Sequence, residues 1–539
     1  MHLKQSPMGQ NVAFVALLSG MLAYWWFTSY WGTPREFWQM SEDGHFLTLG
    51  HALNIDFWLF GQSLRIIGNS EITHPGVAYQ IISWLAYRLS APDFFSNPTD
   101  LVIAVFDNAD WFWPSIQAIP IIMTLGAIWF WWHTSIKYGL IFAVLISLSF
   151  LVNSSSFKYP IWLLFNESFA PILAIIFFPL ASKCLSPKLK NPTLVTMVTG
   201  IAATLIYTQK LTYICWIAAL IGGFCVAGLT KTLGWKDVIL RTTIFLSTAI
   251  SLSLTLCWSF FGSAGLKLMV ANQWLYFTAT EDRSHGSILT LKSLLGGVTK
   301  MFQNEPITLS IIVSMILGFL LLACLKHKDS EWMKDHAPRG ALLFFAILFT
   351  SVGVLKLYHL GDYYIITISV IFPFVLIWLA QSNHNKVLYG LFPLIIIGVF
   401  VSGANQYKEV IQDATRGRLI AQERKMILES PLSQGRSRLW MYSLPVPEFN
   451  RQLLLQFSSL PELDGIIKAY HGHEYLSSPW HNAINYNNRH TDISEVDWQY
   501  HVVHNATVEY IEDKSLHPWI FDKSIQRTRM QHLTVFERP

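Results

Sequence analysis

Two adjacent carboxylates follow the first long apolar segment of the chain. They are Glu42 and Asp43, in the stretch Met40-Ser41-Glu42-Asp43-Gly44-His45-Phe46. Carboxylates beside a bilayer are costly unless they are solvated, paired or chemically active. The aromatic neighbours Trp38 and Phe46 partly exclude water from this pair, and His45 is close enough to handle protons or phosphate. Either carboxylate is therefore a candidate general base for a hydroxyl group, and the alternative is a pair of solvated loop acids.

The composition is that of a membrane protein. The chain has 539 residues, of which 52% are hydrophobic and 13% are charged, whereas soluble domains carry about 25% charged residues. The apolar residues form blocks of roughly 17–25, the length that crosses about 30 Å of hydrocarbon. The net charge of +4 is small for this size and gives no indication of nucleic-acid binding. We therefore predict an all-α polytopic membrane protein, embedded in the lipid bilayer.

About eleven transmembrane helices are predicted. Alternate connections between them are short and basic, and their cations include Lys137, Lys183, Lys231, Lys326 and Lys386. Because cytoplasmic loops are enriched in Lys and Arg, this pattern predicts a cytoplasmic N-terminus and an external C-terminus. The predicted spans are 12–31, 112–132, 138–152, 169–181, 193–207, 212–229, 240–261, 307–325, 341–355, 363–380 and 387–401.

Two domains are predicted. Residues 1–403 form the transmembrane domain, and its first external loop, 33–111, contains the amphipathic segments 46–67 and 77–89. We expect both segments to lie in the membrane interface; a true span over 77–89 is the alternative, and it would invert the orientation of the later loops. Residues 404–539 are polar and form a small α/β extracytoplasmic C-terminal domain. A helix is expected over 406–429, and short strand-like runs over 439–444, 507–511 and 532–537.

The acidic motif resembles one in a known family. A short acidic motif in the first external loop, after one span and before interfacial helices, is similar to that of the GT-C glycosyltransferases. The closest type is the protein O-mannosyltransferases and aminoarabinose transferases. Their motif is Asp-Glu followed by an aromatic residue, and here it reads Glu42-Asp43-Gly44-His45-Phe46. Alignment on His45-Phe46 makes Glu42 the base, whereas alignment on the aspartate makes it Asp43, which we favour modestly.

Further motifs resemble the same family at other predicted external loops. Thr73-His74-Pro75-Gly76 resembles a Lys-Pro-Pro or His-Pro-Pro element, and Glu167 stands where the family carries a second acid. Tyr207-Thr208-Gln209-Lys210 resembles a Thr-Lys-Gly turn, without the glycine. The resemblance implies substrate or phosphate binding by His74, Lys210, Lys356 and His359. His45, beside the acid pair, and Arg283 and His285, in the loop 262–306, are further candidates for phosphate binding. For each, a solvated or snorkelling side chain is the structural alternative.

The resemblance implies a reaction and its partners. A polyprenyl-phosphate-linked sugar would be the donor, and a hydroxyl group of a glycan, lipid or protein the acceptor. Direct displacement would invert the anomeric centre, and the phosphate would leave without protonation. No organic cofactor is implied; if a divalent metal ion takes part, Glu167 is its expected ligand. The implied location is the bacterial inner or plasma membrane, with the reaction at its outer face.

Three other classes of membrane protein remain as alternatives. One is a structural scaffold that displays the C-terminal domain, for which changes at Glu42 and Asp43 would cause no loss of activity. If the chain were a transporter or flippase, charged or broken helices would be expected at mid-membrane. The candidate residues here fall instead at the outer ends of predicted spans. A polysaccharide polymerase or ligase predicts arginines in a large late external loop, and the loop 262–306 holds only Arg283.

Overall fold

The computed structural model divides the chain into two compact units. The first comprises Met1–Phe27, Ile72–Tyr79 and Gln117–Lys408, and the second comprises Thr28–Glu71, Gln80–Ile116 and Glu409–Pro539. The structure describes residues 7–32, 52–59, 77–107, 109–153, 155–157, 169–209, 213–278, 291–357, 365–382, 385–429, 438–441, 474–477, 483–486, 489–492, 499–513 and 522–538.

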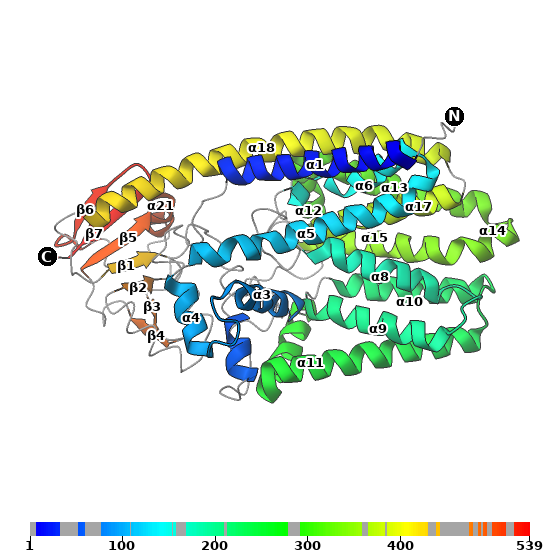
Figure 1. The fold of residues 1–539 in the computed structure, drawn as a ribbon, viewed down its shortest axis with the longest axis horizontal. Coiled ribbons are helices and arrows are strands. Elements are labelled where there is room, and N and C mark those ends of the chain that lie inside the picture. Colours follow the sequence, from blue (N-terminus) through cyan, green and yellow to red (C-terminus); the bar gives the residue numbers. More distant parts are fainter. Residues whose placement is uncertain are drawn as a thin grey trace. The chain divides into compact units, whose positions relative to one another are not determined.

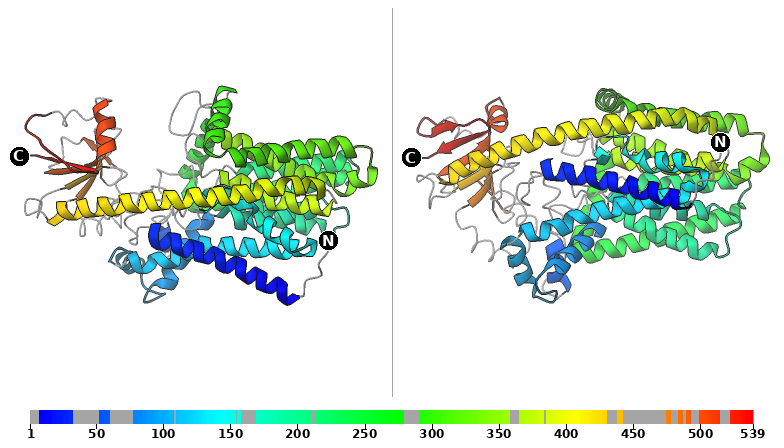
Figure 2. Two further views of the ribbon diagram at one scale, coloured as in Figure 1. Left: turned by 90° about the horizontal axis from the view of Figure 1, so that it is seen from above. Right: turned by 45° about the horizontal axis from the view of Figure 1, so that its top comes forward.

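The first unit is a bundle of helices that run side by side (Figure 1, Figure 2). Most buried side chains in it are apolar or aromatic, with Trp25, Trp131, Trp216 and Tyr213 among the largest, and the buried polar side chains are mainly those of Ser and Thr. Its helices are α1 (Pro7–Gly32), α5 (Ala109–Ser135), α6 (Leu140–Leu148), α8 (Ala170–Cys184), α9 (Pro192–Gln209), α10 (Ile214–Leu229), α11 (Trp235–Thr278), α12 (Leu291–Asn304), α13 (Pro306–Lys326), α14 (Ser330–Asp335), α15 (Ala337–Leu357), α16 (Ile366–Ser369), α17 (Phe372–Gln381) and α18 (Asn385–Glu429).

Five helical stretches among the described residues are long and apolar enough to cross a membrane, which confirms the helical membrane character. They are Ala118–Tyr138, Trp235–Ser259, Pro306–Lys326, Ala337–Lys356 and Val387–Glu409. The predicted number of eleven is not confirmed, because several apolar blocks fold as shorter helices: Leu140–Leu151, Ala170–Cys184, Ile214–Leu229 and Ile366–Gln381.

Local backbone chemistry explains some of these short helices. Gly139 has a φ of 118°, which ends the 3₁₀ turn η2 (Ile136–Tyr138) and separates it from α6. Pro373 stands at the start of α17, where it lacks an N–H for a preceding helical turn. Gly262, with a φ of 68°, bends α11 partway along its length (Figure 1). Apolar composition alone does not reveal such interruptions.

Antiparallel packing of α10 and α15 defines two ends of the bundle. Cys215, at the start of α10, donates its thiol to the Phe349 carbonyl at 3.4 Å, and the Gly353 backbone lies beside the same sulfur. Further along α10, Gly223 packs against Leu342 near the start of α15. We call the two ends of the bundle the Lys356 end and the Arg339 end, after the residues that α15 places at each.

The contact of α12 with α15 leaves no room for a side chain at Gly297. A Cβ at this position would overlap the Leu355 carbonyl oxygen, whereas a Cβ at the neighbouring Gly296 meets nothing within 4 Å. We expect Gly297→Ala to lower the free energy of unfolding by about 1–3 kcal/mol through overpacking. Gly296→Ala should leave it unchanged or raise it, because alanine favours helix. Thermal unfolding of both variants in detergent measures the difference, and equal midpoints would contradict the close packing.

The second unit contains a mixed seven-stranded sheet, in the order β4-β3-β2-β1-β5-β7-β6. The central strand β1 runs parallel to β2 and to β5, and the remaining pairs are antiparallel. The strands are β1 (Arg438–Met441), β2 (Glu474–Ser477), β3 (Ala483–Tyr486), β4 (Arg489–Asp492), β5 (Tyr500–His504), β6 (Gln526–Arg529) and β7 (Leu533–Glu537). The mixture of short strands with helix agrees with the predicted α/β C-terminal region.

One predicted strand is wrong. The run 507–511 lies inside the helix α21 (Asn505–Asp513). Its residues suit a helix here because Val508 is buried, while Glu509 and Glu512 on another face pair with Arg529 and Arg527 of β6. The three-residue spacing of these two acids is a helical periodicity, which the short β-branched run conceals.

The helix predicted over 406–429 is the second half of α18, which continues without a break from Asn385. Residues of α18 up to Lys408 belong to the first unit and the later ones to the second. In the second unit, the buried carboxylate of Glu423 accepts hydrogen bonds from the backbone N–H groups of His532 and Leu533, both at 2.8–2.9 Å. This bond attaches α18 to the start of β7.

A second contact between α18 and the sheet is made by Arg416, whose Nη2 lies 2.8 Å from His504 Nε2. Burial lowers the pKa of His504 to about 4, and the positive charges of Arg416 and His532 act in the same direction. His504 is therefore neutral at pH 7, so its Nε2 accepts a hydrogen bond from the guanidinium group.

Candidate functional site

Most of the predicted site residues lie outside the residues that the structure describes. Lys356 is the exception. The others are Glu42, Asp43, His45, His74, Glu167, Lys210, Arg283, His285 and His359. The structure places only the nearest described neighbours of these residues in the sequence.

Lys356 lies in the last turn of α15, and only 6% of its surface is exposed. The preceding residue, Leu355, packs against Gly297 of α12. Burying a lysine is unfavourable unless its charge has a partner or a ligand. Lys356 already interacts with another group of the protein, so its burial does not by itself require a ligand.

Tyr79, near the start of α3 (Val77–Ser90), contacts two other residues that are close in sequence to predicted motifs. The Tyr79 N–H donates to Gln209 Oε1 at 3.2 Å, and the Tyr79 ring lies 5.2 Å from that of Phe169. All three residues are buried, with at most 1% of their surface exposed. Tyr79 follows His74 by five residues, Phe169 follows Glu167 by two, and Gln209 immediately precedes Lys210.

This contact belongs to the same end of the bundle as Lys356. Gln209 is the last residue of α9, and the next helix, α10, begins at Ile214. Cys215, in the first turn of α10, contacts Phe349 and Gly353, and Gly353 precedes Lys356 by three residues of the same helix. The elements that flank four predicted motifs therefore meet at the Lys356 end.

The second unit contains a buried ion pair that the sequence pattern did not predict. Arg88 Nη2 lies 2.7 Å from Asp56 Oδ2, and the two side chains are 3% and 2% exposed. Trp84 Nε1 also donates to Asp56 Oδ1 at 2.6 Å. Arg88 Nη1 donates to the carbonyl oxygens of Phe94 and Ser96. This network satisfies both charges within the protein, which is the arrangement that a structural ion pair needs.

The ion pair revises the interpretation of the first external loop. Asp56 lies in the predicted interfacial segment 46–67, and Arg88 lies in the predicted interfacial segment 77–89. The helical residues 52–59 and α3 place the two charges against each other, away from solvent. Opposite charges 32 residues apart carry no periodic signal that would predict their pairing.

The described part of the chain contains no group of three His, Cys, Asp or Glu side chains that could hold a metal ion. Asp56, the buried carboxylate closest in sequence to the acid pair, is already occupied by Arg88 and Trp84. Glu167, the predicted metal ligand, lies outside the described residues.

Comparison with known proteins adds no assignment. The site is therefore defined by its own residues, namely a buried lysine at the end of α15 and the buried contact of Tyr79, Phe169 and Gln209. No protein-family model matches the chain, and no curated protein sequence matches it.

Proposed function

We propose that this protein is a membrane glycosyltransferase that moves a sugar from a polyprenyl-phosphate donor to a hydroxyl acceptor, with inversion at the anomeric carbon. The observation that carries the proposal is the buried contact of Tyr79 with Gln209 and Phe169. These residues come from three segments, and each is close in sequence to a motif expected to bind the donor or orient the acceptor. Their meeting at the end of the bundle that holds Lys356 supports a common site.

The proposed chemistry begins at the acid pair. Asp43 or Glu42 takes the proton of the acceptor hydroxyl, whose oxygen attacks the anomeric carbon of the donor. The bond between that carbon and the phosphate oxygen breaks, and the electron pair leaves with the phosphate. One carboxylate suffices, because a lipid phosphate leaves as an anion without protonation.

Positive charge stabilises the leaving phosphate in this proposal. Lys356 is the described member of this set, and its burial strengthens its interaction with an anion. Lys210 and His359 complete the primary set. His74 precedes Tyr79 by five residues and is assigned to the donor as well. Arg283, His285 and His45 are also assigned to the donor, although none is close in sequence to Tyr79, Phe169, Gln209 or Lys356. Glu167 orients the acceptor, or would hold a divalent cation if one is required.

The proposed orientation puts the Lys356 end at the outer face of the membrane. It rests on the basic loops, since Lys137, Lys183 and Arg339 all belong to the opposite end. The plasma membrane, in bacteria the inner membrane, is the proposed location. The C-terminal domain, residues 404–539, is proposed to be extracytoplasmic.

Reconstitution tests the activity directly. The full chain, in phosphatidylcholine vesicles, is supplied with radiolabelled polyprenyl-phosphate sugars and with glycan, lipid and peptide acceptors. We expect release of polyprenyl phosphate coupled to a glycoside of inverted anomeric configuration. Movement of the intact labelled lipid between leaflets, with no sugar released, would instead assign the chain as a flippase. An absence of both activities with all donors would reject the proposal.

A further inference from the structure

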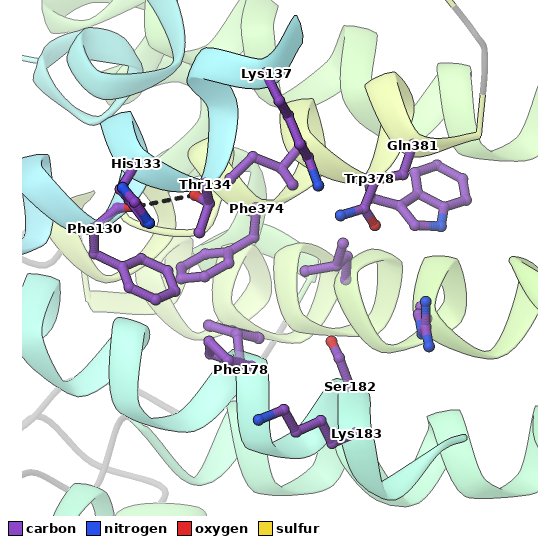
Figure 3. A pocket seen from close by; sticks show the side chains of 14 residues that line it. Phe130, His133, Thr134, Lys137, Phe178, Ser182, Lys183, Phe374, Trp378 and Gln381 are labelled. Atoms are coloured by element: carbon purple, nitrogen blue, oxygen red, sulfur yellow. Dashed lines mark hydrogen bonds between the residues drawn. The ribbon is translucent and has the colours of Figure 1, made fainter. Parts of the chain in front are cut away.

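A cavity of about 340 Å³ lies at the Arg339 end of the bundle. Its walls include the aromatic side chains of Phe178, Phe374 and Trp378 (Figure 3). Lys137, Lys183 and Arg339 also line it, and none of the described residues that line it is acidic. The cavity therefore combines an apolar interior with three positive charges.

The three cations come from separate segments of the chain. Lys137 belongs to the turn η2 after α5, Lys183 to the last turn of α8, and Arg339 to the first turn of α15. Figure 3 shows Lys137 and Lys183 on opposite sides of the cavity, with Phe178 and Phe374 between them. Lys137 and Lys183 are exposed and Arg339 is partly buried, so water and salt screen their mutual repulsion. An anion in the hollow would be attracted to all three charges at once.

The position of the cavity indicates which anion suits it. Two candidate spans, Ala118–Tyr138 and Ala337–Lys356, have their ends at this cavity, so it lies at the level of a membrane surface. Phe374 and Trp378 are 9% and 4% exposed, so they leave a small apolar surface for the glycerol part of a lipid, and Gln381 adds a polar group to the lining. A free phosphate ion would use the cations and not this apolar surface.

We propose that this cavity binds the phosphodiester headgroup of an anionic glycerophospholipid. The cations bind the phosphate oxygens, and the exposed edges of Phe374 and Trp378 contact the glycerol carbons. The Trp378 indole is fixed for this role, because its Nε1 donates to the His336 carbonyl at 3.1 Å. Negative lipids of a cytoplasmic leaflet attract basic residues in just this way.

The lipid site is separate from the proposed catalytic site. Arg339 and Lys356 are both in α15 and are 17 residues apart in the sequence, so a rise of 1.5 Å per residue separates them by about 25 Å along the helix. Binding at the cavity can therefore be measured without a sugar donor, and its failure would leave the proposed transfer reaction untouched.

The test measures lipid binding to the full chain in neutral detergent by native mass spectrometry. Phosphatidylglycerol, phosphatidylcholine and inorganic phosphate are titrated separately. The cavity variant combines Lys137→Gln, Lys183→Gln and Arg339→Gln. The matched control combines Lys188→Gln, Lys190→Gln and Lys236→Gln, which removes the same charge from exposed lysines that do not line the cavity.

We expect phosphatidylglycerol to bind at least tenfold more tightly than phosphatidylcholine, and the cavity variant to lose this preference while the control keeps it. Equal losses in both variants would overturn the proposal, because they would indicate diffuse charge attraction. Inorganic phosphate that displaces the lipid at equal concentration would also overturn it, in favour of a free-anion site. If the triple variant does not fold, Lys137→Gln and Lys183→Gln are measured singly; both side chains are exposed, so each variant should fold and should lose part of the preference.

Discussion

Combining Glu42→Gln with Asp43→Asn is expected to lower the rate of sugar transfer by a factor of about 10²–10⁴, the contribution typical of a general base. Both substitutions keep the size of the side chain and its ability to form hydrogen bonds, but neither amide can take a proton from the acceptor. Binding of the donor should persist, because its phosphate is assigned to the cations. The measurement is initial transfer rate against donor concentration, in vesicles with a fixed amount of protein.

The single variants decide which carboxylate is the base. The residue whose replacement reproduces the full loss is the base, and replacement of the other should cost about tenfold or less. Asp93→Asn is a matched control, since Asp93 is an exposed acid of the same predicted external loop and bonds only locally, to the Phe95 N–H at 2.9 Å. Full activity in the double variant would reject the mechanism, and an equal loss in the Asp93 control would point to a general charge effect.

The class of fold could be predicted from the sequence because the hydrophobicity of a whole segment determines whether it forms a membrane helix. Blocks of apolar residues indicate membrane helices whatever their neighbours are. The length of each helix could not be predicted so well, because it depends on single residues. Gly139 and the start of α17 at Phe372 divide apolar blocks that composition alone treats as continuous. The helix α21 was not predicted because residues 507–511 are rich in β-branched and aromatic residues, which suit a strand. Its helical spacing becomes evident only from the ion pairs that Glu509 and Glu512 form with β6.

The candidate site was predictable only as a set of separate motifs. The predicted order of the spans determines which loops and helix ends share a side of the membrane. The sequence could therefore place several motifs on one predicted side. Which residues touch could not be predicted, because contacts such as Tyr79 with Gln209 join segments 130 residues apart through side chains of no special type. The basic cavity was likewise invisible. Its lysines appear in the sequence as ordinary orientation signals, and a shared hollow is a property of the packed helices.

Arg88→Met is expected to lower the free energy of unfolding by about 3–5 kcal/mol, the typical result of breaking a buried ion pair. Methionine fills much of the arginine volume, but it leaves the Asp56 carboxylate in a buried position with Trp84 as its remaining donor. The carbonyl oxygens of Phe94 and Ser96 also lose their donor. Unfolding by heat or denaturant in detergent, followed by tryptophan fluorescence, measures the change.

Arg529→Met is the matched control for this prediction. Arg529 Nη2 lies 2.7 Å from Glu509 Oε1, the same separation as in the buried pair, but these side chains are 51% and 63% exposed. Exposed pairs contribute about 0–1 kcal/mol because water solvates each charge when its partner is removed. The double variant Asp56→Asn with Arg88→Met should recover part of the stability lost in Arg88→Met, since it no longer buries an unpaired charge. Similar losses for Arg88→Met and Arg529→Met would show that burial does not govern the strength of the pair, and would contradict its role as a structural ion pair.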